Sequence, residues 1–113
     1  MELTINGNTQ ALNFGVRFVR ELDKVAGIEK SGVQLGFGLT RSLPGMQTYN
    51  PATLSDVIYA ATATNSPRPS QNDVDDYVDG IETVEESEQL FEQINEGIDK
   101  ANALKAALKN MKA

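Results

Sequence analysis

The side chains most able to do chemistry in this chain are carboxylates, because its 113 residues include no histidine and no cysteine. Four aspartates fall in one short segment: Asp73, Asp75, Asp76 and Asp79. Asp75 and Asp79 are one helical turn apart, so they would share a helix face, and such a pair could ligate Mg²⁺ or Ca²⁺. The segment lacks the alternating ligand positions and closing glutamate of a calcium loop. We therefore interpret the cluster as a solvated helix face.

The glycine-rich segment from Gly32 to Gly38 raises a second chemical possibility, a loop that binds phosphate. Phosphate loops need Gly-Lys-Ser/Thr, or Gly-x-Gly-x-x-Gly between a strand and a helix. The segment Gly36-Phe37-Gly38-Leu39-Thr40-Arg41 matches neither pattern. A serine nucleophile is also disfavoured, because there is no histidine to activate it. The sequence thus predicts no enzyme, and no catalytic, cofactor-binding or metal-binding residues.

The overall charge narrows the classes of partner. The net charge is −6 and the isoelectric point is near 4.5, which argues against binding nucleic acid or an anionic membrane by general attraction. No apolar run approaches the ~20 residues that cross a bilayer. The start, Met1-Glu2-Leu3-Thr4, lacks the pattern of a signal peptide. We expect one domain, residues 1–113, that acts in solution inside a cell.

The elements that must position these side chains begin with a β-hairpin. Leu3 and Ile5 alternate with polar residues before Asn6-Gly7-Asn8, and Asn-Gly is a strong hairpin signal because both residues tolerate positive φ. A helix ending near Gly27 follows, with apolar residues at helical spacing. They are Phe14, Phe18, Leu22 and Val25.

The middle of the chain predicts three further helices. The first covers about 36–47 and is weakened by glycine and Pro44; a strand at 33–37 is the alternative. The second begins at Asn50 as N-cap with Pro51 in the first position, and runs to about Thr64. A linker at 65–69 precedes the third, which starts after Ser70 and ends near Gly80.

The last segment, 82–113, predicts a long helix in which acidic residues come first and lysines last, in agreement with the helix dipole. It carries an apolar stripe in a loose heptad pattern that Lys105 interrupts. Two interpretations stay open, ordinary core or a surface that binds a partner, as does partial extension of this helix from the core. The candidate partner-binding residues are Leu90, Phe91, Ile94, Ile98, Ala101, Leu104 and Leu108. The predicted fold is mainly α (α+β): an N-terminal β-hairpin followed by four to five helices, the last one long.

Several segments together resemble the tail assembly chaperones of long-tailed bacteriophages (siphoviruses), in the version common among phages and prophages of Gram-positive bacteria. No single segment is a strong motif, and the resemblance lies in their order and spacing over most of the chain. The segments are Met1–Gly7, Phe18–Asp23, Gly32–Leu39, Asn50–Thr62, Val74–Tyr77 and Leu90–Glu92.

The resemblance implies a binding function without catalysis. Such proteins bind the long apolar tape-measure protein, keep it soluble, help to recruit tail-tube (major tail) subunits and then leave. It implies the host bacterial cytoplasm as the location, absence from the mature virion, and neither nucleic acid nor membrane as partner. We further expect self-association, since several copies along one client would supply avidity. The alternatives are a structural tail-completion or connector protein retained in the virion, and a small cytoplasmic adaptor unrelated to phage.

Overall fold

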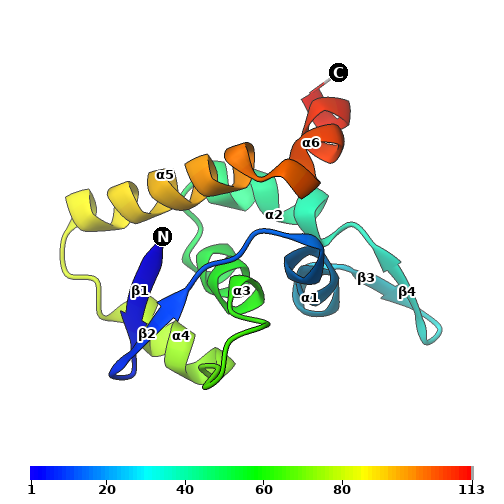
Figure 1. Ribbon diagram of the computed structural model, residues 1–113. Coiled ribbons are helices and arrows are strands. Elements are labelled where there is room, and N and C mark those ends of the chain that lie inside the picture. The colour runs from blue at the N-terminus through cyan, green and yellow to red at the C-terminus, as the bar shows by residue number, and fades with distance from the viewer. Residues whose placement is uncertain (113) are drawn as a thin grey trace.

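The computed structural model describes residues 1–112, and within them the chain forms six helices and two antiparallel hairpins (Figure 1). This confirms the predicted mainly α (α+β) class and its N-terminal hairpin. In chain order the elements are β1 (Glu2–Ile5), β2 (Asn8–Ala11), α1 (Val16–Ala26), β3 (Ile28–Lys30), β4 (Val33–Gly36), α2 (Gly38–Gln47), α3 (Pro51–Ala61), α4 (Gln71–Asp79), α5 (Val84–Lys100), the 3-10 turn η1 (Asn102–Leu104) and α6 (Lys105–Lys112).

The β1–β2 hairpin closes over the Asn-Gly turn that the sequence predicts. Asn6 and Gly7 both adopt positive φ, 50° and 79°, and Ile5 pairs with Asn8 across the turn. The hairpin is tied to the helices by two contacts of its return strand. The backbone N–H of Asn13 donates to the Ala61 carbonyl at 2.9 Å, and the Asn65 amide donates to the Ala11 carbonyl at 2.8 Å.

Helix α3 is the central element, with α1 packed on one side and α4 on the other. It begins as predicted, because the Asn50 side chain accepts hydrogen bonds from the Ala52 and Thr53 N–H groups and Pro51 needs no hydrogen-bond acceptor at the first position. Its end at Ala61 comes three residues before the predicted one. Five apolar side chains of α3 are buried, namely Leu54, Val57, Ile58, Ala60 and Ala61.

Helix α4 also begins as predicted. Ser70 and Asp73 form a reciprocal capping box, in which the Ser70 hydroxyl accepts from the Asp73 N–H and the Asp73 carboxylate accepts from the Ser70 N–H. Val74 is fully buried, and Gly80 follows the last helical residue. The preceding linker runs along the surface, and Arg68 from this linker reaches back to α1 and α3.

The predicted long C-terminal helix is wrong in its length. Helix α5 ends at Lys100, Ala101 is extended (φ −69°, ψ 120°), and η1 and α6 continue in a new direction (Figure 1). The physical reason is the phase of the apolar stripe. In one continuous helix Lys105 would occupy a position of the apolar stripe. The break at Ala101 instead leaves Lys105 exposed, while Leu104 and Leu108 enter the core.

Helix α5 is closely approached by an aromatic side chain at Gly97. A Cβ atom at Gly97 would lie 2.8 Å from the Phe14 ring, so only glycine leaves room for this aromatic side chain. The Phe14 ring in turn packs edge-on against Phe18, with ring centroids 5.2 Å apart. The segment before α1 is thereby fixed against the last long helix.

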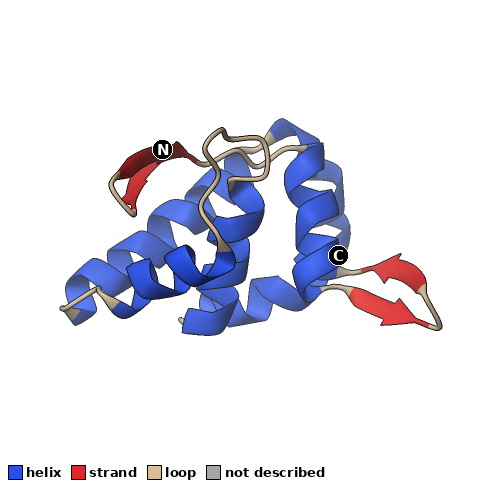
Figure 2. Cartoon of the chain, turned by 90° about the horizontal axis from the view of Figure 1, so that it is seen from below, coloured by secondary structure: helices blue, strands red, loops and turns tan. Residues whose placement is uncertain are grey.

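The glycine-rich segment contains both structures that the sequence left open, a strand followed by a helix. Strand β4 pairs with β3, which was not predicted, over a turn in which Ser31 and Gly32 have positive φ. Helix α2 starts at Gly38, two residues after the predicted start, and contains Pro44. The β3–β4 hairpin projects from the helical body, at the opposite end from β1–β2 (Figure 2).

Candidate partner-binding surface

The structure places the predicted partner-binding residues along the inner side of the molecule. Six of the seven side chains are no more than 7% exposed: Leu90, Phe91, Ile94, Ile98, Leu104 and Leu108. Ala101 is half-buried at the break between α5 and η1. They form one continuous part of the core, together with buried residues of α1, α2 and α3. Binding of a partner through these side chains stays a prediction, and it requires α5 or α6 to move away from the body.

Exposed apolar side chains gather instead on and beside the β3–β4 hairpin. Val33 is 58% exposed, Leu35 48% and Phe37 55%. Ile28 of β3 and Val16 of α1 are also exposed. Sequence reasoning missed this group as a site, although Val33, Leu35 and Phe37 alternate with Gln34 and Gly36 in the period of a strand.

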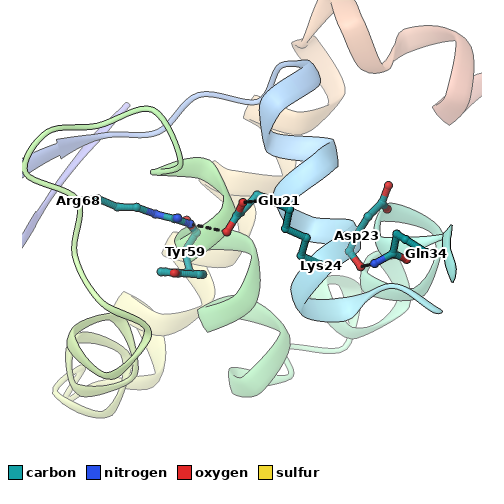
Figure 3. A network of polar contacts seen from close by, with 6 residues as sticks. All are labelled: Glu21, Asp23, Lys24, Gln34, Tyr59 and Arg68. Carbon is teal, nitrogen blue, oxygen red and sulfur yellow. Dashed lines mark hydrogen bonds and ion pairs between the residues drawn. The ribbon is translucent and has the colours of Figure 1, made fainter. Parts of the chain in front are cut away.

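The hairpin is held to the body through its polar residues (Figure 3). The Gln34 side-chain amide donates to the Asp23 carbonyl at 2.8 Å, while its oxygen accepts from the Gly36 N–H at 3.0 Å. The Asp23 carboxylate accepts from the Gly38 N–H at 2.9 Å. Because Gln34 reaches α1 and alternate residues of a strand project to opposite faces, Val33 and Leu35 project away from α1.

The chain also approaches itself closely at the base of the hairpin. A Cβ atom at Gly38 would lie 2.7 Å from the Leu22 carbonyl oxygen, so α2 can begin against α1 only with glycine at this position. The preceding residue, Phe37, has φ 68° and ψ 12°, a left-handed conformation that is rare for an aromatic residue. A strained backbone of this kind persists only where its surroundings hold it, and it is often found at functional sites.

An apolar groove of about 330 Å³ adjoins Phe37. It lies between α1, the start of α2 and the η1–α6 segment. Its lining residues are Val16, Val19, Asp23, Phe37, Leu39, Thr40, Ala103, Leu104, Ala107 and Met111. Leu104 is the one predicted partner-binding residue that lines it. We call this groove, together with Val33 and Leu35, the hairpin–groove surface.

A second hollow, of about 630 Å³, lies on the other side of Val16. It is bounded by the beginning of α1 and the end of α3, and its lining includes Arg17, Arg20, Ala60 and Ala63. Both arginines are exposed. The two hollows therefore share Val16 and form neighbouring parts of one side of α1.

The linker after α3 is fastened beside this side of α1 by Arg68 (Figure 3). Its guanidinium donates to the Glu21 carboxylate at 3.2 Å and to the Tyr59 carbonyl at 2.9 Å. The same guanidinium stacks 3.8 Å from the centroid of the Tyr59 ring. These contacts join α1, α3 and the linker, so they hold α1 in place under the two hollows.

The aspartates of the predicted helix face serve different roles. Asp73 caps α4, and Asp75 accepts a hydrogen bond from the Ser55 hydroxyl. Burial raises the pKa of the nearby Asp56 carboxyl above its usual range, and the Asp75 charge raises it further.

Within residues 1–112, no group of three or more carboxylates is placed to hold a metal ion. None of the helices described there has the length and apolar character needed to cross a bilayer.

Comparison with known proteins gives one match. A family model described as phage tail assembly chaperone protein, TAC, matches residues 2–112. No curated protein and no solved structure matches the chain.

Proposed function

Because this chain belongs to the phage tail assembly chaperone family, we propose that it binds the phage tape-measure protein before the tail forms, keeps that protein soluble and helps to recruit tail-tube subunits. Membership of a chaperone family implies a role without catalysis. The proposed site of client binding is the hairpin–groove surface.

The observation that carries this proposal is the exposure of Val33, Leu35 and Phe37, the last of which lines an apolar groove. Large apolar side chains grouped on the surface of a small protein are typical of interaction sites. A groove of this kind suits the apolar face of a partner helix, because the helix buries its stripe and keeps its own backbone hydrogen bonds. A tape-measure protein presents long apolar helical surface, which aggregates when it is left uncovered.

The rest of the surface fits a transient role in solution. A charged exterior with a net charge of −6 keeps a protein that carries an apolar patch soluble. We place its action in the host bacterial cytoplasm and expect it to be absent from the mature virion. Self-association along the client would add avidity to weak individual contacts, so that tube subunits can displace the chaperone.

The direct test is co-expression with the tape-measure protein of the same phage. The wild-type chaperone should raise the soluble fraction of the tape-measure protein and co-purify with it. The double variant Leu35→Gln/Phe37→Asn should lose both effects, because it removes apolar surface without touching the core. Val84→Gln is the matched control, since Val84 is exposed and apolar but lies at the start of α5, outside the hairpin–groove surface.

Two results would contradict the proposal. If the tape-measure protein is equally soluble without this chain, the chaperone function fails. If the double variant and Val84→Gln behave like wild type, binding occurs elsewhere. Purified virions provide a separate check, because a stoichiometric amount of this chain in them would favour a structural tail protein.

A further inference from the structure

We propose that the hairpin–groove surface recognises a partner helix whose apolar stripe is flanked by acidic side chains. This inference rests on the proposed function and specifies the chemistry of the segment that is bound.

Charge is strongly segregated along the chain. Residues 69–99, which include α4 and nearly all of α5, contain eleven acidic residues and no basic one. All ten basic residues lie outside this segment, although the net charge is −6. The molecule therefore has an acidic part in α4 and α5, and its positive charge lies on other elements, including α1 and α6.

Positive side chains lie beside the groove, on its α1 side. Arg17 and Arg20 line the hollow that shares Val16 with the groove, and both are exposed. Neither forms an ion pair within residues 1–112. One acidic residue lines the groove, Asp23, and its carboxylate accepts a hydrogen bond from the Gly38 N–H. Arg17 and Arg20 thus set two unpaired positive charges on this side of α1 against one carboxylate in the groove.

A helix with an apolar stripe and acidic flanks would match both the apolar lining of the groove and the positive side chains beside it. Its stripe would cover Val16, Phe37 and Met111, and the carboxylates on one flank would face Arg17 and Arg20. The acidic part formed by α4 and α5 would repel such a helix, and the basic side would attract it, so the charge distribution would also orient its approach. A helix with basic flanks would meet like charges at the groove.

A second copy of this chain fits the groove less well. Its acidic helix α5 has the required charge, but the apolar side of α5 is buried in its own core through Phe91, Ile94 and Ile98. The large apolar residue that this acidic segment exposes is Val84, at the beginning of the helix. A second copy would therefore present carboxylates to the groove but no exposed apolar stripe. We assign the groove to a different protein.

The test uses three synthetic helical peptides of about 20 residues, long enough for several helical turns. They share one leucine and alanine stripe and carry glutamate, glutamine or lysine on its flanks. Binding to the full chain is measured by fluorescence anisotropy at low and high salt. The glutamate peptide should bind about tenfold more tightly than the glutamine peptide, and the lysine peptide should bind more weakly than both. Salt should reduce these differences, because exposed charges are screened.

Charge reversals on α1 locate the effect. Arg17→Glu and Arg20→Glu should each weaken binding of the glutamate peptide about fivefold and strengthen binding of the lysine peptide. Lys24→Glu is the matched control on the same helix. The Lys24 side chain is 71% exposed and lines neither hollow, so its reversal should change affinity by less than about twofold.

The possible failures are distinguishable. Equal affinity for all three peptides, with Phe37→Asn weakening each, would overturn the acidic preference and leave the proposed function intact. No peptide binding, together with an unchanged soluble fraction of tape-measure protein, would overturn both. Self-association that the glutamate peptide abolishes, with no tape-measure protein bound at the groove, would assign this surface to a second copy and overturn the inference.

Discussion

Helix α5 and the β3–β4 hairpin are both amphipathic, and they are oriented in opposite ways. Helix α5 buries Phe91, Ile94 and Ile98 and exposes its carboxylates. The hairpin instead contacts the body through polar Gln34 and exposes Val33 and Leu35. An amphipathic pattern therefore identifies two faces but does not say which one points inward.

Size and attachment explain the difference. Helix α5 has 17 residues and offers a long stripe, and burying that stripe supplies much of the core of a small protein. The hairpin has strands of three and four residues, too short to cover a core. Its position is fixed at its base by Asp23 and Gly38, so its apolar residues need not pack inward for it to stay in place. The surface that we propose for client binding thus includes the outward residues of the smaller element.

The largest effect should come from α5. Phe91→Ala removes a ring that is 1% exposed and packs edge-on against Tyr49, and it should lower the free energy of unfolding by about 3–5 kcal/mol. Urea unfolding followed by circular dichroism measures this. If the urea concentration at the midpoint of unfolding is unchanged, Phe91 is not part of the core. The difference drawn here between α5 and the hairpin would then be wrong.

An intermediate effect is expected at the base of the hairpin. Gly38→Ala places a methyl group 2.7 Å from the Leu22 carbonyl oxygen, and the forced shift of α2 against α1 should cost about 1–3 kcal/mol. Hydrogen exchange of the β3–β4 amides should accelerate at the same time, because the Asp23 contact to residue 38 is disturbed. Gly15→Ala is the control, since no atom lies within 4 Å of the added methyl group and the φ of Gly15 is −106°, which alanine also adopts. If both variants behave alike, the close approach has no special role.

A smaller effect on stability is expected at Phe37. Asparagine tolerates the left-handed conformation better than phenylalanine, and the ring is largely exposed, so Phe37→Asn should change the free energy of unfolding by less than about 1 kcal/mol. Thermal unfolding measures this change, and the co-expression assay should show loss of client binding in the same variant. A loss of stability like that of Phe91→Ala would show that the ring belongs to the core.

The smallest effect should come from Asp56, which lies in neither element. Burial and the Asp75 charge raise its pKa in the folded state, so the folded state binds more protons than the unfolded state between the two pKa values. The free energy of unfolding then falls as pH rises through this interval. Asp56→Asn should be slightly more stable than wild type at pH 7, and the gap should close below about pH 3, where the carboxyl is protonated in both states. Denaturation at several pH values tests this, and client binding should not change.

The sequence predicted those parts of the fold that depend on local chemistry. The Asn6-Gly7 turn and the caps at Asn50 and Ser70 each determine a boundary through a few neighbouring residues, and the structure has them where they were expected. The break at Ala101 depends on how Leu104 and Leu108 reach a core built by distant segments. No local signal such as proline marks it, and the misplaced Lys105 was the single hint.

The candidate site was harder to predict for the same reason. Its groove joins α1, the start of α2 and α6, which are distant in sequence, and the exposure of Phe37 depends on the contacts of Asp23 and Gln34. The period-2 pattern of Val33, Leu35 and Phe37 was visible, but it is typical equally of an inward-facing strand. The partner-binding site was predicted on the last helix instead, because its apolar stripe is longer and a long periodic pattern is a clearer signal than a short one.

The fastening of the β3–β4 hairpin has a consequence for how such proteins can diversify. Asp23, Gln34 and the backbone of Gly36 and Gly38 hold it, and the side chains of Val33 and Leu35 take no part. Mutations can therefore change Val33 and Leu35 with little effect on the stability of the fold. Under the proposed function, a phage lineage whose tape-measure protein drifts in sequence could follow it at these few positions, keeping the scaffold while the specificity evolves.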